Sequence, residues 1–416
     1  MNADEKPSLA SQLRAALNHQ RFDELIDTEP PGGGEPRVVA YMPNVDLAVI
    51  ELDEQGRPRE AANVLLSTHY PQGVVVPIDE NMSTTAVRWR RWNVDEWNEG
   101  LAGSEDILPG RESAPLEYMT ARPASVLKLM VGFGVLRLVD RGVIGLDDML
   151  VYAPADTSCG TPGSNTIRTW FDLMITVSDN RATCALIKML HDLGEMDALN
   201  ATFRELGLSM LQLTGTNPTT GGVFIHSVMS ALDTARLLLI INGSPGTLWH
   251  APDGRPVTAD VLSGSSRRFF YRLLAEQGLN IALSTVNWGE RQYPAAGIPQ
   301  RVPERWINPV DGTVTVAGRV FGQDVRPCNA KAEVVFAHKT GWTNVSGGDA
   351  GIVTSLPGAP RRHYIVAMLS ILGKRFVDPN RPPDPPGVYP VGFTERLALL
   401  GREIDSIMTA RAAQRR

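Results

Sequence analysis

The sequence predicts an α/β (α+β) fold in which an antiparallel sheet is flanked by the terminal helices and carries an all-helical subdomain. Three observations lead to this prediction. A helix and the first strands precede residue 59, the middle of the chain is mostly helical, and three strands followed by a last helix end the sequence. Helices from both ends of the chain are therefore expected to cover one face of the sheet.

The N-terminal part begins with a predicted helix. Apolar residues recur at helical spacing between Ser8 and Ile26, and the proline and glycine run at 30–34 ends the pattern. The stretch Val45 to Pro58 predicts a strand that runs into a turn at Gln55 and Gly56.

Helical periodicity returns from Ala124 to Arg141 and again from Ile167 to about Ile241. After a polar region come "AEVVFAHKTGW", "AGIVTSL" and "RRHYIVAMLSI", which predict an antiparallel meander, and then a last helix from about 393 to 412. We divide the chain into an N-terminal helix with the first strands (1–58), an insertion or small subdomain (59–119), an all-helical subdomain (120–278), an insertion (279–331) and the C-terminal strands and helix (332–416).

Composition excludes some classes of function. The 416 residues are 43% hydrophobic, enough for a large core, and the formal net charge is −6 without a long basic run, which argues against nucleic acid as a partner. No uninterrupted apolar run is long enough to span a bilayer, so no membrane association is expected.

Three scattered cysteines, none in a C-x-x-C pair, predict reduced thiols. The first residues are acidic and lack the apolar region of a signal peptide, so as numbered the chain is expected in the cytoplasm. If a leader peptide was removed before the residues were numbered, an exported protein is expected instead.

Three short motifs indicate the chemistry: Ser125-x-x-Lys128, Ser178-Asp179-Asn180 and Lys339-Thr340-Gly341. Pro123 suits the first turn of a helix, which places Ser125 near a helix N-terminus and one turn before Lys128. A serine hydroxyl needs a base to take its proton, and a desolvated lysine close to a second cation can be that base. Lys339 is the expected second cation.

These motifs, in this order, resemble those of class A β-lactamases and penicillin-binding proteins. The resemblance implies the β-lactamase/transpeptidase-like fold and gives roles to the motif residues. Ser178 would return a proton to the leaving nitrogen, and Asn180 would hold Lys128 and the substrate amide. Lys339 and Thr340 would bind a substrate carboxylate, and the N–H groups of Trp342 and Ser125 would form an oxyanion hole.

Each motif also has a plainer interpretation. Lys128 could reach solvent from a surface helix, and Ser178 to Asn180 could simply cap the following helix. Gly341 follows an apolar strand, where the missing side chain would let substrate lie along the strand edge.

The sequence departs from the class A pattern on one loop. Class A β-lactamases use a glutamate between the second and third motifs to activate the deacylating water, but no acidic residue lies between Glu205 and Asp233 here. The glutamate-proline pair of the family falls most naturally on Asn217-Pro218, and a neutral amide cannot act as a general base. Acylation of Ser125 is therefore expected, with slow deacylation and with Asn217 beside the substrate.

The sequence offers little evidence for other ligand-binding or metal-binding residues. The turn after Gly341 lacks the arginine that some members of the family use to grip a carboxylate, and the histidines show no metal-ligand spacing, so His338 is expected to be an ordinary strand residue. Tryptophans in the stretch 87–100 either flank a ligand or pack an accessory element; they are Trp89, Trp92 and Trp97.

We therefore predict an active-site-serine hydrolase that forms an acyl-enzyme at Ser125 and needs no metal or cofactor. Its partner would be a small molecule, a β-lactam or an acyl-D-alanine-like amide or ester. Two alternatives stay open: a D-alanyl-D-alanine peptidase-like or esterase penicillin-recognising protein, and a non-catalytic binding protein on the same fold. The sequence gives no signal for an oligomeric state.

Overall fold

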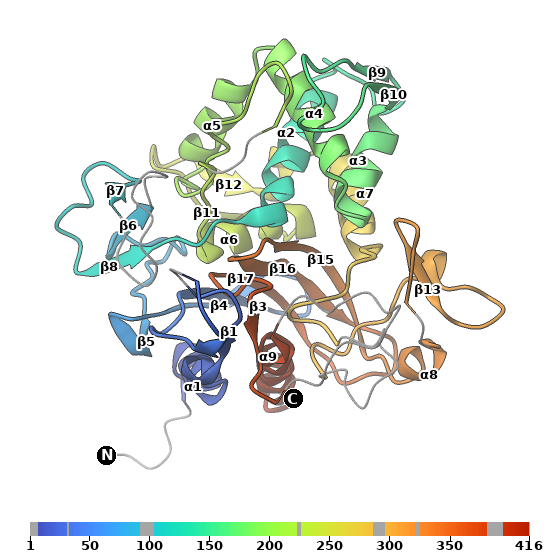
Figure 1. The fold of residues 1–416 in the computed structure, drawn as a ribbon. Helices are drawn as coiled ribbons and strands as arrows, with labels where there is room; N and C mark the ends of the chain where they lie inside the picture. Colours follow the sequence, from blue (N-terminus) through green and yellow to red (C-terminus); the bar gives the residue numbers. More distant parts are fainter. Residues whose placement is uncertain are drawn as a thin grey trace.

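The computed structural model describes residues 7–30, 33–91, 104–222, 226–285, 296–321, 324–380 and 394–415. These residues form three layers (Figure 1). An antiparallel sheet lies in the middle, the two terminal helices cover one of its faces, and helices from the middle of the chain cover the other. This is the α/β arrangement that the sequence predicts.

In the described part of the chain, the central sheet has six strands that all pair antiparallel. In spatial order they are β15 (Val334–Trp342), β16 (Gly347–Ser355), β17 (His363–Ser370), β3 (Val45–Leu52), β4 (Pro58–Ser67) and β5 (Tyr70–Val75). The pairing of β3 with β17 joins the two ends of the sequence. β15 forms one edge, and it carries the third motif.

Both faces of the sheet are apolar because it lies between two cores. In β17, Ile365 and Ala367 belong to the core shared with the middle helices, while Tyr364 and Val366 belong to the core under the terminal helices. The alternation follows from the two-residue repeat of a strand. The terminal helices are α1 (Leu9–His19) and α9 (Glu395–Ala413).

The helical subdomain carries the first two motifs. Its elements are η3 (Ala124–Leu127), α2 (Lys128–Asp140), α3 (Ile167–Thr176), α4 (Asn180–Asp192), α5 (Met196–Glu205), α6 (Ala231–Asn242) and α7 (Gly264–Ala275). Every residue of α2 from Lys128 to Leu136 is buried, since this helix runs through the middle of the subdomain. Lys128 is thus part of a core helix and does not reach solvent.

One buried carboxyl group joins the sheet to the helical subdomain. Asp46 of β3 accepts hydrogen bonds from the Ala231 N–H at the start of α6 (2.7 Å) and from Nδ2 of Asn63 on β4 (2.7 Å). Burial raises the pKa of Asp46 to about 7, although these two hydrogen bonds oppose the shift; the charge of Asp233 adds to it.

Shorter elements complete the described chain. They are β1 (Ile26–Asp27), β2 (Arg37–Val38) and β18 (Phe376–Val377) in one sheet; β6 (Val87–Arg91), β7 (Glu105–Asp106) and β8 (Leu116–Met119) in another; the pairs β9 (Met149–Tyr152) with β10 (Gly163–Thr166), β11 (Thr247–His250) with β12 (Pro256–Thr258) and β13 (Val314–Val316) with β14 (Arg319–Phe321); and η1 (Phe22–Glu24), η4 (Ala259–Val261), η5 (Glu304–Trp306) and α8 (Arg326–Asn329). No helix among the described residues combines the length and the apolar character needed to cross a membrane.

The stretch 59–75 differs from the expectation of an insertion. It supplies nearly all of β4 and the whole of β5, so a boundary at residue 59 cuts through the central sheet. β4 lies between two other strands, and its residues 62–67 are all buried. The other domain boundaries stay predictions.

The expectation of three reduced thiols is wrong for two of the cysteines. Cys159 and Cys184 form a disulfide, with their Cα atoms 6.3 Å apart, and Cys328 on α8 is free. The two residues are 25 positions apart in sequence, and the chain through β10 and α3 brings them together.

Candidate active site

Lys128 is the centre of the candidate site. Its Nζ donates hydrogen bonds to the backbone carbonyl of Ser178 (2.7 Å), to Oγ of Ser178 (3.0 Å) and to Oδ1 of Asn180 (2.9 Å). The side chain is buried, with 1% of its surface exposed. The structure therefore brings the first two motifs into direct contact, and the interpretation of Lys128 as a surface lysine is wrong.

The surroundings of Lys128 disfavour its charged form. Burial holds the pKa of Lys128 well below the ordinary value of lysine, and the charge of Lys339 lowers it further, while Asp179 acts in the opposite direction. The neutral amine keeps two N–H groups, enough for two of these three hydrogen bonds, and its lone pair can accept a proton. The third motif thus acts on the first through its charge.

Ser178 adopts an unusual backbone conformation that serves this contact. Its φ is +59°, in the left-handed region that residues other than glycine rarely occupy. Both its carbonyl and its hydroxyl face Lys128 as a result. Asp179 then caps α4, since its Oδ1 accepts from the Ala182 N–H (2.6 Å). The capping interpretation of this motif holds for Asp179, alongside the contacts of Ser178 and Asn180 with Lys128.

Ser125 lies in η3, one helical turn before Lys128 and directly against the end of β15. A Cβ on Gly341 would come within 2.7 Å of the backbone nitrogen of Ser125 and within 2.9 Å of the Pro123 carbonyl oxygen. Only glycine permits this approach of the strand to η3. The residue before Ser125, Ala124, also has a positive φ (+48°). Backbone strain of this kind gathers at functional sites.

Lys339 and Thr340 are both fully buried on β15. Nζ of Lys339 donates to the carbonyl of Thr340 (2.8 Å), and burial lowers the pKa of Lys339 to about 7, opposed by the charge of Asp349. The Thr340 hydroxyl makes a long hydrogen bond to the Leu279 carbonyl (3.4 Å), so it is oriented toward the segment that follows α7. Trp342 ends the strand, half-buried, with Nζ of Lys374 5.9 Å from its ring centre.

The side chain of Asn217 is hydrogen-bonded within its own loop. Its Oδ1 accepts hydrogen bonds from the N–H (2.8 Å) and from the hydroxyl (2.8 Å) of Thr219. The structure thus places the Asn217 side chain in a local turn, and its expected position beside the substrate stays a prediction.

His338 is an ordinary buried strand residue, as expected. Its Nδ1 lies 2.7 Å from Oδ1 of Asp349, and its Nε2 lies 3.0 Å from Oδ1 of Asn280. Asp349 was not singled out from the sequence, although it faces Thr340 in the neighbouring strand and influences Lys339. It belongs to no motif, so only the register of β15 with β16 reveals it.

Trp89 packs into a small core and contacts Tyr118 edge to face, which fits the accessory-element interpretation. Trp92 and Trp97 lie outside the described residues. Among the residues that the structure describes, no three His, Cys, Asp or Glu side chains are grouped so that they could hold a metal ion.

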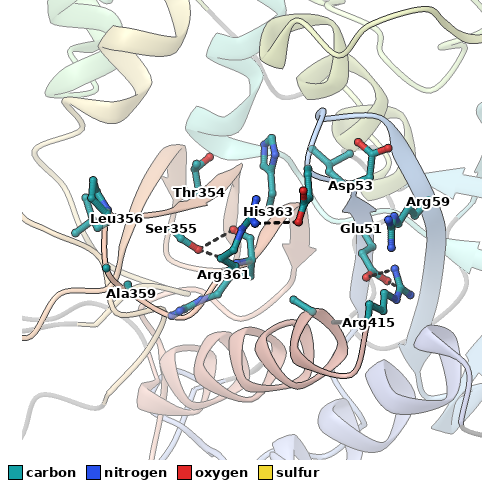
Figure 2. A pocket seen from close by; sticks show the side chains of 16 residues that line it. Glu51, Asp53, Arg59, Thr354, Ser355, Leu356, Ala359, Arg361, His363 and Arg415 are labelled. Carbon is teal, nitrogen blue, oxygen red and sulfur yellow. Dashed lines mark hydrogen bonds and ion pairs between the residues drawn. The ribbon is translucent and has the colours of Figure 1, made fainter.

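A separate cavity of about 410 Å³ lies at the far end of the sheet, beside the C-terminal end of α9. Figure 2 shows Glu51 and Arg415 directed toward each other at its side. Arg361 also pairs with Glu54 (2.9 Å). Because its charges largely compensate one another and it contains none of the three motifs, this cavity is not the candidate active site.

The fold and the cluster around Lys128 agree with the resemblance to the serine β-lactamase and penicillin-binding superfamily that the motifs indicate. Consistent with this, residues 117–283 match the model of the Beta-lactamase enzyme family. The match contains the first two motifs, and it confirms the resemblance that the three motifs indicate. No curated protein matches the sequence.

Several solved structures are similar to this chain. The structure of PBP-A is 18% identical, with 99% of this chain and 98% of that chain covered and a TM-score of 0.48. A β-lactamase from Sphaerobacter thermophilus is 15% identical, with 97% and 98% covered and a TM-score of 0.46. A β-lactamase from Chitinophaga pinensis is 16% identical, with 88% and 93% covered and a TM-score of 0.44.

Proposed function

We propose that the protein is a serine hydrolase that is acylated at Ser125 by β-lactam-like amides or esters and releases the acyl group slowly. The observation that carries the proposal is the state of Lys128: a buried amine with a lowered pKa, hydrogen-bonded to Ser178 and Asn180, one turn after Ser125. Such an amine is the base that a serine nucleophile needs.

Acylation at Ser125 would use these groups in the following way. The neutral amine of Lys128 takes the proton of the Ser125 hydroxyl while the oxygen attacks the substrate carbonyl. The backbone N–H groups of Ser125 and Trp342 hold the oxyanion that forms. When the C–N bond breaks, the proton passes from Lys128 through the Ser178 hydroxyl, 3.0 Å away, to the leaving nitrogen, and an ester remains on Ser125.

Lys339 supports a preference for anionic substrates. It is a buried cation whose Nζ is held by a backbone carbonyl, and a substrate carboxylate would restore the charge balance at this point. Thr340 and Gly341 would border the same substrate along the strand.

Slow deacylation rests on Asn217. Hydrolysis of the ester requires a base that activates water, and the Asn217 amide is neutral and engaged with Thr219. The same observation favours a second candidate function, a D-alanyl-D-alanine peptidase-like or esterase protein that recognises penicillin and turns over slowly.

The test combines a chromogenic cephalosporin with a fluorescent penicillin, followed by intact mass spectrometry. We expect a persistent adduct of one penicillin per chain that is absent in Ser125→Ala. Ser164→Ala, at an exposed position on β10, is the matched control and should form the adduct normally. Rapid colour without a lasting adduct would show efficient turnover instead. Neither colour nor adduct would favour the non-catalytic binding protein.

A second assay separates the two hydrolase candidates. An acyl-D-alanyl-D-alanine peptide and its thioester analogue are offered in place of the antibiotic, and released D-alanine or thiol is measured. Release that depends on Ser125 would favour the peptidase or esterase, and its absence beside adduct formation would favour the β-lactamase-like enzyme.

A further inference from the structure

The Cys159–Cys184 disulfide lies next to the candidate site. Cys184 is fully buried on α4, four residues after Asn180, so the two side chains share one face of the helix. Asn180 binds Lys128 from the first turn of this helix. A covalent bond to Cys184 therefore ties the loop that contains Cys159 to the helix turn that positions Lys128.

The same loop is also held by Arg181. Nε of Arg181 donates to the carbonyl of Thr161 (2.7 Å), and its Nη2 donates to the carbonyl of Pro162 (2.6 Å). Because Arg181 directly follows Asn180, both tethers reach the loop from the beginning of α4.

The loop that contains Asn217 packs against the same part of α4. A Cβ on Gly221 would come within 2.0 Å of the Cys184 carbonyl oxygen, so the backbone of this loop lies directly on α4. The Ala155 N–H donates to the Thr219 carbonyl (3.1 Å), which joins the two loops to each other. The disulfide is thus the covalent part of one packed unit made of the 153–162 loop, the 217–222 loop and α4.

We propose that the Cys159–Cys184 disulfide is a positioning element of the candidate site, which holds both loops against α4 so that the oxidised protein binds an acyl donor more tightly than the reduced protein. This inference rests on the proposed function. Lys128 and Asn180 lie on helices and Ser178 lies in the short connection between α3 and α4, so we expect their contacts to remain when the disulfide is reduced. The loops at the rim depend on it.

Reduction by dithiothreitol supplies a direct test. The reaction breaks the S–S bond, two thiols form, and dithiothreitol is oxidised to its cyclic disulfide. We expect reduction to raise KM for the chromogenic cephalosporin, or the half-saturation concentration for acylation, by about tenfold, because small displacements of positioning groups have large effects. The limiting rate of acylation should change by less than about threefold, and reoxidation should restore the starting values.

Cysteine variants separate this effect from general effects of the reductant. Cys159→Ala with Cys184→Ala should match the reduced protein and should not respond to dithiothreitol. Cys328→Ser, which removes the free cysteine on α8, should behave as the parent protein. Arg181→Ala weakens the second tether without cysteine chemistry, and it should raise KM in the oxidised protein as well.

Three results would overturn the proposal. The first is a thiol titration of the unfolded, unreduced protein that finds three thiols where one is expected. The second is an unchanged KM after reduction, and the third is a parallel fall of the limiting rate and of the melting temperature, which would make the bond merely structural. Limited proteolysis of the 153–162 loop gives a readout that does not need activity. If the oxidised protein forms no adduct at Ser125, the proposed function fails. Proteolysis of the oxidised and reduced proteins then still decides whether the disulfide holds this loop.

Discussion

Ser125 and Gly341 approach each other so closely that the backbone nitrogen of Ser125 would lie 2.7 Å from a Cβ on residue 341. The obstacle is backbone on the Ser125 side, which cannot rotate away as a side chain would. Gly341→Ala should therefore push β15 away from η3 and separate the two N–H groups of the oxyanion hole. We expect the rate of Ser125 acylation to fall by about 100-fold or more.

The measurement for Gly341→Ala is single-turnover adduct formation by mass spectrometry, with the fold checked by circular dichroism. Gly264→Ala, at the start of α7, is the control, because this glycine has no positive φ and a Cβ there would meet only the flexible ends of the Arg267 and Arg268 side chains. Normal acylation in Gly341→Ala would contradict the oxyanion role of this contact.

Lys128→Arg tests the need for a neutral amine. Arginine keeps its charge at all accessible pH values, so the variant cannot take the Ser125 proton, and acylation should slow by about 100- to 10,000-fold. Lys188→Arg is the matched control, because Lys188 is a partly exposed lysine of α4 in an ion pair with Asp192. If Lys128→Arg acylated within about threefold of the parent, another base would have to be sought.

The charge of Lys339 should appear in the pH dependence of substrate binding. Its pKa is lowered to about 7, so the protonated fraction falls as the pH rises through this value. We expect KM for a substrate with a free carboxylate to rise above pH 7. The methyl ester of the same substrate lacks the charge and should show no such rise. An equal rise for acid and ester would count against Lys339 as the carboxylate ligand.

Asp46 should make stability depend on pH. Its pKa is raised to about 7 in the folded protein, so between about pH 4 and pH 7 the folded state keeps a proton that the unfolded chain has released. This contribution is fully present below about pH 4 and is lost as the pH rises through about 7, with an upper bound on the order of 4 kcal/mol.

Asp46→Asn should remove this dependence. Asn63 has a buried Oδ1 without a hydrogen-bond partner, and after rotation of its amide this oxygen can accept from the new side chain. Urea unfolding at a series of pH values should show that the free energy of unfolding of Asp46→Asn, relative to the parent, increases between about pH 4 and 7 and is constant above. A constant difference across that range would contradict a raised pKa of Asp46.

Asn217 should affect its loop more than the acylation step. Asn217→Ala removes two hydrogen bonds to Thr219 and should lower the free energy of unfolding by about 1 kcal/mol, with acylation nearly unchanged. Asn217→Glu supplies the base whose absence makes deacylation slow in the proposed function, so we expect it to shorten the lifetime of the adduct. Mass spectrometry over time measures the adduct lifetime, and rapid loss in Asn217→Glu would show that the loop can present a base to the ester.

The sequence predicts those parts of the site that depend on short-range patterns. Ser125 and Lys128 are one helical turn apart, and Lys339 ends an apolar strand, so local spacing alone assigns both to their elements. The sequence indicates strand-like segments after residue 59 but does not assign β4 to the central sheet, because β4 is buried on both faces toward its end and lacks the alternation that marks a half-exposed strand.

The contacts that could not be predicted link distant segments. The Ala231 N–H donates to Asp46 only because α6 packs on the sheet. Cys159 forms a disulfide with Cys184 only because the chain turns back through β10 and α3. The disulfide bears on location as well. Since such bonds persist in oxidising compartments, we propose export from the cytoplasm in place of the cytoplasmic expectation.

The pairing of β3 with β17 also has a consequence for synthesis of the protein. Val45 leaves the ribosome long before Ser370, yet the two are partners in the register of the sheet. Until the C-terminal strands are made, the apolar edge of β3 has no neighbour on that side. An unpaired strand edge can pair with another chain and start aggregation. We therefore expect chaperones to protect the nascent chain, and their supply should limit the yield of soluble protein during rapid expression.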